Sequence, residues 1–463
     1  MELRAWQSEC IARALERYSS EHSDFLCLAT PGAGKTTMAA ALVKQLFATN
    51  MIDLVVCISP SIIISHDFQA ELGKQVGKRF DGSMGSYGRS ITYQTMINLG
   101  CEFWELFTEY RVFVIFDEIH HCAGSNLENS NTWGETIISK IQGKAIGTLA
   151  LTGTPWRSDF VPVSLARYND LGEVNCDYRY GLAQAIKDKV CRSPNIMLID
   201  NNQVTLSESG AAKSFGSFRE LFQNGNCSYQ SLVENETLIT YMLNKANKKL
   251  NLLRRKTPNA AGLIVTSSVY HARKVHEILR VKLKETADIV TYMEDDAVST
   301  IKSFKSSTTK WVISVGMISE GTNIPRLRVC CHLTRVKTEL NFRQVLGRIL
   351  RSDGVGQSEG YLYVPAEPAL IEYSHRVSEE VPKECVINFD ESPTITIQGQ
   401  DQKPGVVVSP EATELTTASE ISDSWLALGE QVECINSPQI YNATLSLFGQ
   451  FKQELLSIDS ISI

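Results

Sequence analysis

The chain has 463 residues, 43% of them hydrophobic and 21% charged, and a formal net charge of −7. A single hydrophobic core rarely grows past about 250–300 residues, so this length predicts a soluble globular protein with two core-forming domains and a smaller piece. The charge is uneven, since residues 376–463 carry 4 basic and 14 acidic side chains, whereas residues 1–375 carry 41 and 38, a net of +3. The acidic total therefore does not exclude a basic groove in the main body.

The start of the chain and its cysteines bear on location. MELRAWQSEC lacks the apolar core of a secretory signal, and no run approaches the ~18 apolar residues of a membrane-spanning helix. The 12 cysteines are scattered and form no CxxC pair, which favours reduced and mostly buried thiols. We therefore expect a cytoplasmic protein with no membrane contact.

Short apolar runs alternate with helical patterns over the first part of the chain. This alternation is typical of a doubly wound α/β domain with a parallel sheet. The expected domain spans residues 1–165. Its clearest elements are a helix at 36–48 and strands at 25–29, 54–58, 112–116 and 146–151.

A second α/β domain is expected over residues 166–375. A polar, partly helical insert over about 200–258 ends in the basic run KANKKLNLLRRK. That run is either a solvated surface helix or a contact for a phosphate backbone, and the sequence leaves both open. The other elements of this domain are strands at 196–199, 262–266, 311–315, 328–333 and 361–364 and helices at 270–285 and 338–351.

The alternation is lost over residues 376–463. The stretch 391–420 is rich in Ser, Thr, Pro, Gln and acidic residues, which predicts an acidic, low-complexity linker or tail. The last forty residues regain apolar content in WLAL and LSLFGQFKQELL. We expect a short amphipathic helix there, docked on the body or on a protein partner.

The stretch ATPGAGKT, residues 29–36, follows an expected strand and opens an expected helix, which is the context of a phosphate-binding P-loop. Its glycines let backbone N–H groups curl around phosphates, Lys35 reaches the terminal phosphates, and the Thr36 hydroxyl serves Mg²⁺. Ala29 stands where the motif has its first glycine. The residues expected to bind ATP and Mg²⁺ here are Thr30, Pro31, Gly32, Ala33, Gly34, Lys35, Thr36 and Thr37.

An acidic pair follows a later apolar strand in VFVIFDEIHHC, residues 112–122. A P-loop needs a second acidic site for Mg²⁺ and for water activation. We expect Asp117 to hold Mg²⁺ through water, opposite Thr36, and Glu118 to orient and deprotonate the attacking water.

The same stretch also resembles a metal-binding cluster, but its spacing argues against one. The adjacent His120 and His121 point in different directions in a strand or a helix. Cys122 has no cysteine at CxxC distance, and no HExxH spacing occurs. A zinc site is therefore disfavoured.

A second cluster of candidate phosphate ligands lies in FRQVLGRILR, residues 342–351. In a helix, Gln344, Arg348 and Arg351 share one face, and Gly347 allows close approach beside them. One amide and two guanidiniums suit the charge that develops on a γ-phosphate during hydrolysis. Alone, the stretch also fits a solvent-exposed basic face, but a P-loop upstream favours the catalytic interpretation.

In this order the motifs resemble those of superfamily 2 helicases and translocases of the DEAD/DEAH class, over about residues 3–375. The similar stretches in the first domain are LRAWQ (3–7), ATPGAGKT (29–36), ISPSIIISHDF (58–68), ITYQTM (91–96), DEIH (117–120) and TGTP (152–155). Those in the second domain are GLIVTSS (262–268), SEGTNIP (319–325) and QVLGRILR (344–351).

The resemblance implies two tandem RecA-like domains that close on ATP and open after hydrolysis. It makes Arg348 and Arg351 the fingers that complete the ATP site from the second domain. Further roles that it implies are adenine recognition by Arg4 and Gln7 and ribose contact by Gly321 and Asn323. The resemblance also implies that ATP state is coupled to domain movement by His120, Thr152 and Thr154. The residues that it implies for contact with nucleic-acid backbone are Pro60, Ser61, Thr92 and Gln94.

Within the superfamily, TGTP, DEIH and TELNFRQVLGRILR look most like XPB-like DNA translocases and helicase subunits of restriction and phage-encoded repair systems. That likeness implies single-stranded or forked DNA as partner, in repair, recombination or defence. No nuclease motif is evident, so a nuclease or another defence or repair subunit would be a partner through the C-terminal tail. An ATP-gated DNA-binding subunit of a larger complex and an RNA helicase remain alternatives.

Overall fold

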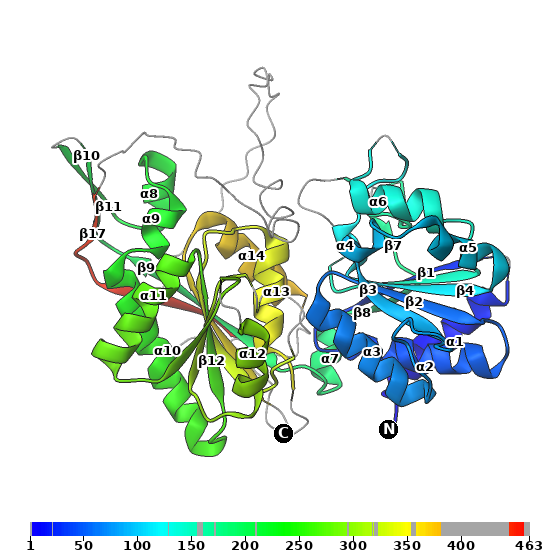
Figure 1. Ribbon diagram of the computed structural model, residues 1–463. Helices are drawn as coiled ribbons and strands as arrows, with labels where there is room; N and C mark the ends of the chain where they lie inside the picture. Colours follow the sequence, from blue (N-terminus) through cyan, green and yellow to red (C-terminus); the bar gives the residue numbers. More distant parts are fainter. Residues whose placement is uncertain are drawn as a thin grey trace, which may run out of the picture.

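The computed structural model describes residues 2–20, 22–127, 129–154, 161–170, 173–208, 211–293, 296–316, 318, 323–352, 358–380 and 444–457. These residues form two α/β domains that lie side by side, each built on its own sheet (Figure 1). The expected fold of two RecA-like parallel-sheet domains is confirmed.

The first sheet has six parallel strands. In spatial order they are β3 (Gly88–Thr92), β2 (Leu54–Ser59), β4 (Val112–Asp117), β5 (Gly147–Thr152), β1 (Asp24–Ala29) and β8 (Tyr178–Tyr180). All six residues of β4 and of β5 are buried, because helices cover both faces of a parallel sheet. One face packs on α1 (Ala5–Tyr18), α2 (Lys35–Ala48) and α3 (Ile62–Val76), and the other on α4 (Tyr93–Met96), α5 (Cys101–Glu109) and α6 (Thr132–Thr136).

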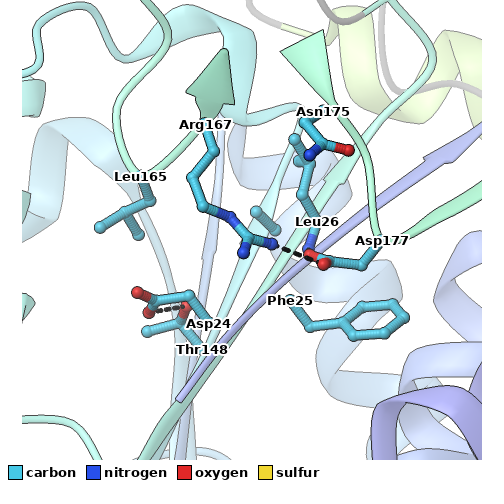
Figure 2. Close-up of a pocket in the computed structure, with 9 residues that line it drawn as sticks. Asp24, Phe25, Leu26, Thr148, Leu165, Arg167, Asn175 and Asp177 are labelled. Atoms are coloured by element: carbon cyan, nitrogen blue, oxygen red, sulfur yellow. Dashed lines mark hydrogen bonds and ion pairs between the residues drawn. The ribbon is translucent and has the colours of Figure 1, made fainter. Parts of the chain in front are cut away.

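The chain remains bound to the first domain well beyond residue 165. A short hairpin of β6 (Arg167–Tyr168) and β7 (Val174–Asn175) leads into β8, which pairs with β1. Arg167 Nη2 donates to Asp177 Oδ1 at 2.5 Å, and Asp177 Oδ2 accepts from the backbone N–H of Leu26 at 2.8 Å (Figure 2). The predicted boundary at 165 stays a prediction, but the pairing of β8 with β1 and the bonds of Asp177 attach this part of the chain to the first sheet.

The second sheet has seven strands, all parallel except the last. In spatial order they are β13 (Ala287–Val290), β14 (Trp311–Ser314), β12 (Ala261–Thr266), β15 (Leu327–Leu333), β16 (Glu359–Pro365), β9 (Ser193–Asn201) and β18 (Phe451–Ser457). Its helices are α10 (Glu236–Lys256), α11 (Val269–Ile278), α12 (Ala297–Ser306), α13 (Glu339–Ile349) and α14 (Pro368–Glu379). A short helix, α7 (Leu182–Lys187), precedes β9.

The predicted insert over 200–258 is in part a structural layer of the second domain. It begins with β10 (Val204–Glu208) and β11 (Ala211–Phe215), followed by α8 (Phe218–Asn224) and α9 (Tyr229–Val233). The basic helix α10 then buries an apolar stripe that includes Leu243 and Leu250. Its Lys248 and Arg255 are exposed, so the helix is a surface helix of the domain, as the plainer interpretation expected.

The amphipathic helix expected near the C-terminus is wrong for the described residues. LSLFGQFKQELL instead spans β17 (Thr444–Leu447) and β18, which pair antiparallel with β10 and β9. A Cβ on Gly449, between them, would lie 2.5 Å from the backbone nitrogen of Gln203, so the turn needs a glycine. WLAL lies outside the described residues. No helix within the described ranges is long and apolar enough to span a bilayer.

A chain that ends at residue 443 should lose stability, because β18 covers the edge of β9 and Phe451 stacks on Tyr241 with 4.1 Å between ring centroids. We expect a loss of about 2 kcal/mol, which lowers the melting temperature by roughly 5 °C. A chain that ends at residue 457 is the matched control and should melt like the full chain. Equal melting of all three chains in differential scanning calorimetry would contradict the role of β18.

Candidate active site

The P-loop joins β1 to α2 at the carboxyl edge of the first sheet. Gly32 and Gly34 have φ values of 84° and 96°, a left-handed conformation that favours glycine. Gly34 caps α2, so the N–H groups of the first helical turn, including those of Lys35 and Thr36, face the loop. The positive end of a 14-residue helix therefore lies where a phosphate is expected.

The Lys35 ammonium reaches the acidic pair at the end of β4. Its Nζ lies 3.2 Å from Glu118 Oε1 and donates to the carbonyl of Ala29 at 3.2 Å. Glu118 has a φ of 51°, and its second carboxylate oxygen accepts from the backbone N–H of Gly153 at 3.2 Å. Asp117, the last residue of β4, is 7% exposed. The two predicted acidic residues and the P-loop lysine thus belong to one site.

The predicted coupling residues form a hydrogen-bonded chain behind Glu118. His120 Nδ1 lies 2.9 Å from Thr152 Oγ1 and 3.5 Å from Glu118 Oε2. Thr152 Oγ1 donates to the carbonyl of Thr154 at 2.8 Å and accepts from its N–H at 3.0 Å. These contacts connect the acidic pair to the TGTP motif, of which Pro155 lies outside the described residues. Coupling to domain motion stays a prediction.

The residues predicted to recognise adenine hold the P-loop in this structure. Arg4 Nη1 donates to the carbonyl of Ala33 at 2.5 Å, and Gln7 Nε2 donates to the carbonyl of Gly34 at 2.9 Å. The Gln7 side-chain oxygen accepts from the N–H of Arg4 at 2.8 Å, which fixes both side chains. They lie beside the phosphate loop, and contact with adenine stays a prediction.

Pro31, at the crest of the P-loop, packs against the second domain. A Cβ on Gly347 of α13 would lie 2.7 Å from Pro31 Cβ, and one on Gly153 would lie 3.1 Å from Pro31 Cδ. The thiol of Cys191, in the segment between the domains, lies 3.6 Å from the Pro31 carbonyl. Glycine at both positions is therefore what permits this close contact.

Arg351 extends from the second domain over the same loop. Its Cγ would lie 2.9 Å from a Cβ on Gly32, and its Nη1 donates to Asn323 Oδ1 at 3.0 Å. Burial lowers the pKa of the Arg351 guanidinium, while the nearby Glu118 and Asp117 carboxylates are among the groups that raise it. The guanidinium is thus within electrostatic range of the acidic pair. Gly321, predicted beside Asn323, lies outside the described residues.

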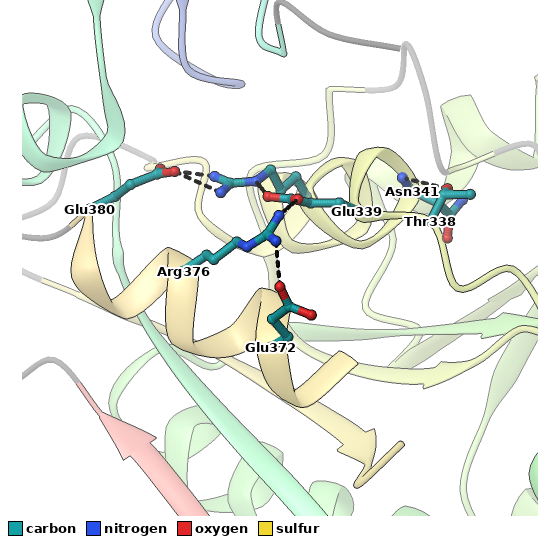
Figure 3. A network of polar contacts seen from close by, with 7 residues as sticks. Thr338, Glu339, Asn341, Glu372, Arg376 and Glu380 are labelled. Atoms are coloured by element: carbon teal, nitrogen blue, oxygen red, sulfur yellow. Dashed lines mark hydrogen bonds and ion pairs between the residues drawn. The ribbon is translucent and has the colours of Figure 1, made fainter. Parts of the chain in front are cut away.

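Gln344 and Arg348 lie on α13, on the face that also carries Gly347. Arg348 is 6% exposed, so the solvent-exposed alternative is wrong for this residue. A network of arginine–glutamate ion pairs holds α13 against α14. Its members are Arg343, which bonds Glu339 at 2.9 Å and Glu380 at 2.6 and 2.8 Å, and Arg376, which bonds Glu339 at 2.6 Å and also Glu372 (Figure 3).

The residues predicted to contact nucleic-acid backbone lie at the carboxyl ends of β2 and β3, two neighbouring strands of the first sheet. Ser61 caps α3 by accepting from the N–H of Ile64 at 3.4 Å, and Thr92 caps α4 by accepting from that of Thr95 at 3.1 Å. Pro60 and Gln94 flank these caps, with Gln94 exposed. The structure brings the four together at one sheet edge, but binding stays a prediction.

Cys191 is a residue of the site that was not predicted. Burial raises the pKa of its thiol to about 12, although Arg4, Arg351 and Lys35 lower it. The thiol is therefore protonated and able to donate to the Pro31 carbonyl. Neither its spacing nor its type distinguishes it from the other cysteines. Within the described ranges, no group of three or more His, Cys, Asp or Glu side chains is placed to hold a metal ion.

Comparison with known proteins agrees with this geometry. Residues 1–157 match the family model "Type III restriction enzyme, res subunit", and residues 244–353 match "Helicase conserved C-terminal domain". Two uncharacterized mycobacterial proteins are each 29% identical to the chain. The one from Mycobacterium tuberculosis strain H37Rv aligns over 80% of this chain and 62% of its own length, and that from Mycobacterium leprae over 82% and 64%. The chain thus spans less than two thirds of these relatives.

Two solved structures share the fold at 15% identity and a TM-score of 0.54. One is the ATP-dependent Type ISP restriction-modification enzyme LlaBIII bound to DNA, aligned over 82% of this chain and 30% of that one. The other is a fragment assigned to the HsdR subunit of a type I restriction enzyme from Vibrio vulnificus YJ016, aligned over 80% and 65%.

The fold and the site define a two-domain nucleotide-binding protein of the RecA-like class, with a P-loop that packs against Gly347 and Arg351 of the second domain. The two family matches cover these domains in the order that helicases have. The chain belongs to the superfamily 2 helicases.

Proposed function

We propose that the chain is a DNA-dependent ATPase that hydrolyses ATP between its two sheets and uses the resulting domain movement to translocate along DNA or unwind it. One observation carries the proposal. Lys35 lies 3.2 Å from Glu118, and Arg351 of the second domain packs over the same P-loop at Gly32. A phosphate bound there would meet the lysine, the acidic pair and a guanidinium together.

The donor set at this point fits MgATP. The Thr36 hydroxyl and the Asp117 carboxylate are oxygen ligands of the kind that Mg²⁺ prefers. Asp117 ends β4, and only β5 separates β4 from β1, the strand that leads into the P-loop. Bound Mg²⁺ would neutralise charge on the β- and γ-phosphates. Lys35 would turn from Glu118 to the terminal phosphate, which frees the carboxylate to accept a proton from water.

The second domain supplies the remaining charge. Arg351 already contacts the P-loop through its aliphatic stem, and Arg348 is buried on the helix that packs on Pro31. Guanidiniums in these positions would stabilise the charge that develops on the transferred phosphoryl group, with Gln344 beside them. Because they belong to the other domain, hydrolysis would depend on the domains being closed.

DNA as the partner is supported by the match of residues 1–157 to a restriction-enzyme subunit and by the fold shared with a restriction enzyme bound to DNA. We propose that the chain acts in a restriction-like defence process or in repair. A nuclease or another subunit would bind through residues 376–463.

Measurement of ATP turnover with single-stranded DNA, forked DNA, duplex DNA and RNA tests the proposed function. We expect single-stranded or forked DNA to raise the rate of phosphate release at least 10-fold over the protein alone, with RNA giving less. Stimulation by RNA alone would overturn the DNA assignment. Stimulation by DNA without strand displacement on a fork would favour a translocase or an ATP-gated binding subunit over an unwinding enzyme.

Glu118→Gln should retain ATP binding and lose at least 100-fold in turnover, because the amide keeps the shape of the carboxylate but cannot accept a proton. Equilibrium binding of a fluorescent ATP analogue and phosphate release under the same conditions check the two halves. Glu109→Gln, at the exposed end of α5, is the control and should behave as wild type. Unchanged turnover in Glu118→Gln would place the base elsewhere.

Gly347→Ala should lower turnover about 10-fold without loss of stability. The added methyl meets Pro31 at 2.7 Å and moves α13 away from the P-loop, whereas alanine favours a helix over glycine. Gly181→Ala is the control, since a Cβ there meets nothing within 4 Å. Wild-type turnover in a folded Gly347→Ala protein would show that the contact is dispensable.

A further inference from the structure

Arg192 lies in the segment that joins the two domains, directly before β9, and is 1% exposed. Its guanidinium donates to three backbone carbonyls and one hydroxyl. Nη1 donates to the carbonyls of Leu327 at 2.9 Å and Ile349 at 3.3 Å, Nη2 to that of Pro325 at 2.9 Å, and Nε to Ser358 Oγ at 3.0 Å. A single side chain therefore connects the linker to three separate segments of the second domain.

Arg192 completes the carboxyl end of α13. The last carbonyls of a helix accept no hydrogen bond from within the helix. A positive charge beside them is favourable. The Ile349 carbonyl accepts from the Arg192 guanidinium, and the Leu350 carbonyl accepts from the Arg192 backbone N–H at 2.8 Å. Arg351 follows at once, so Arg192 fixes the point at which the arginine that faces the P-loop leaves its helix.

The same side chain also fixes the acceptor of Arg351. Asn323, which accepts from Arg351 Nη1 at 3.0 Å, is two residues before Pro325, whose carbonyl Arg192 binds at 2.9 Å. On the other side of Arg192, Cys191 forms a backbone bridge with Arg351 and lies 3.6 Å from the Pro31 carbonyl. The linker is thus in contact with the P-loop and with Arg351.

We propose that Arg192 is a positioning residue for ATP turnover, which holds Arg351 in place and links it to the P-loop through the interdomain segment. This inference rests on the proposed ATPase function. It assigns a role in turnover to a side chain whose hydrogen bonds to Leu327, Ile349, Pro325 and Ser358 lie within the second domain and not at the P-loop. Loss of Arg192 should act on turnover through Arg351 and leave ATP binding unchanged.

A double-mutant cycle with Arg351 tests the proposal, because residues that act through one another give non-additive losses. Arg351→Ala should lower kcat about 1,000-fold, as removal of an arginine finger does, and Arg192→Met about 30-fold through misplacement. The double variant should lose no more than Arg351→Ala alone, in full-length protein assayed by single-turnover release of labelled phosphate. Binding of a fluorescent ATP analogue to Arg192→Met should stay within about threefold of wild type. A loss equal to the product of the two single losses would overturn the proposal.

Arg326 offers a matched control. It is also buried, at 7% exposure, but its guanidinium binds the Thr309 carbonyl and lies over the Phe304 ring. Arg326→Met tests the cost of losing a buried guanidinium as such, and its effect should be the same with and without Arg351. If Arg192→Met does not fold, Ser358→Ala removes only the acceptor of Nε. That variant should lose about threefold in kcat in the wild-type background and nothing further in Arg351→Ala. Additive loss would again reject the positioning role.

Hydrogen exchange separates failure of this inference from failure of the proposed function. Without nucleotide, Arg192→Met or Ser358→Ala should speed amide exchange over residues 344–352, and Arg326→Met should not. Faster exchange in a chain whose wild type shows no turnover would reject the ATPase function and keep the anchoring role. Unchanged exchange in a chain whose wild type hydrolyses ATP would reject the anchoring role.

Discussion

The packing of Pro31 between the two domains is the contact on which the site depends. Its ring lies against positions 347 and 153, where a Cβ would come within 2.7 and 3.1 Å of it, and its carbonyl faces the Cys191 thiol. Phosphate-binding loops are formed by backbone, so a shift of the loop moves every donor in it together. The second domain therefore contacts the P-loop through Gly347 of α13 as well as through Arg351, which follows that helix. A domain movement of less than an ångström at this contact would shift the N–H donors of the loop relative to a bound phosphate.

Charge compensation stabilises the partly buried side chains of Lys35 and Glu118. The side chains of Lys35 and Glu118 are 10% and 23% exposed, and a charge so buried is costly unless it is paired. Their 3.2 Å ion pair meets that need. A phosphate bound beside Lys35 would compete with Glu118 for the ammonium. In the proposed mechanism, that exchange would release the Glu118 carboxylate to act as the base.

Much of the fold followed from local pattern. Continuous apolar runs such as 112–116 marked parallel strands because both faces of such strands are buried, and the glycines of ATPGAGKT marked a backbone that only a phosphate loop needs. Two features had no local signal. β18 is a strand only because the edge of β9 is open to it about 250 residues earlier in the chain, while its own sequence fits a helix equally well. Arg192 binds backbone carbonyls, and any residue supplies a carbonyl, so no motif records the contact.

Glu118 combines an unfavourable backbone conformation with a side chain that contacts both Lys35 and the Gly153 N–H. A non-glycine residue in the left-handed region costs about 1–2 kcal/mol, and Glu118 adopts a φ of 51° directly after a fully buried strand. The turn is what sends its carboxylate to Lys35 and to the N–H of Gly153, whereas Asp117 stays in line with β4. Glycine would relieve the strain but remove the only carboxylate that joins the P-loop to the 152–154 segment in these bonds. The strained conformation of Glu118 is therefore explained by the contacts of its side chain and not by the preference of its backbone.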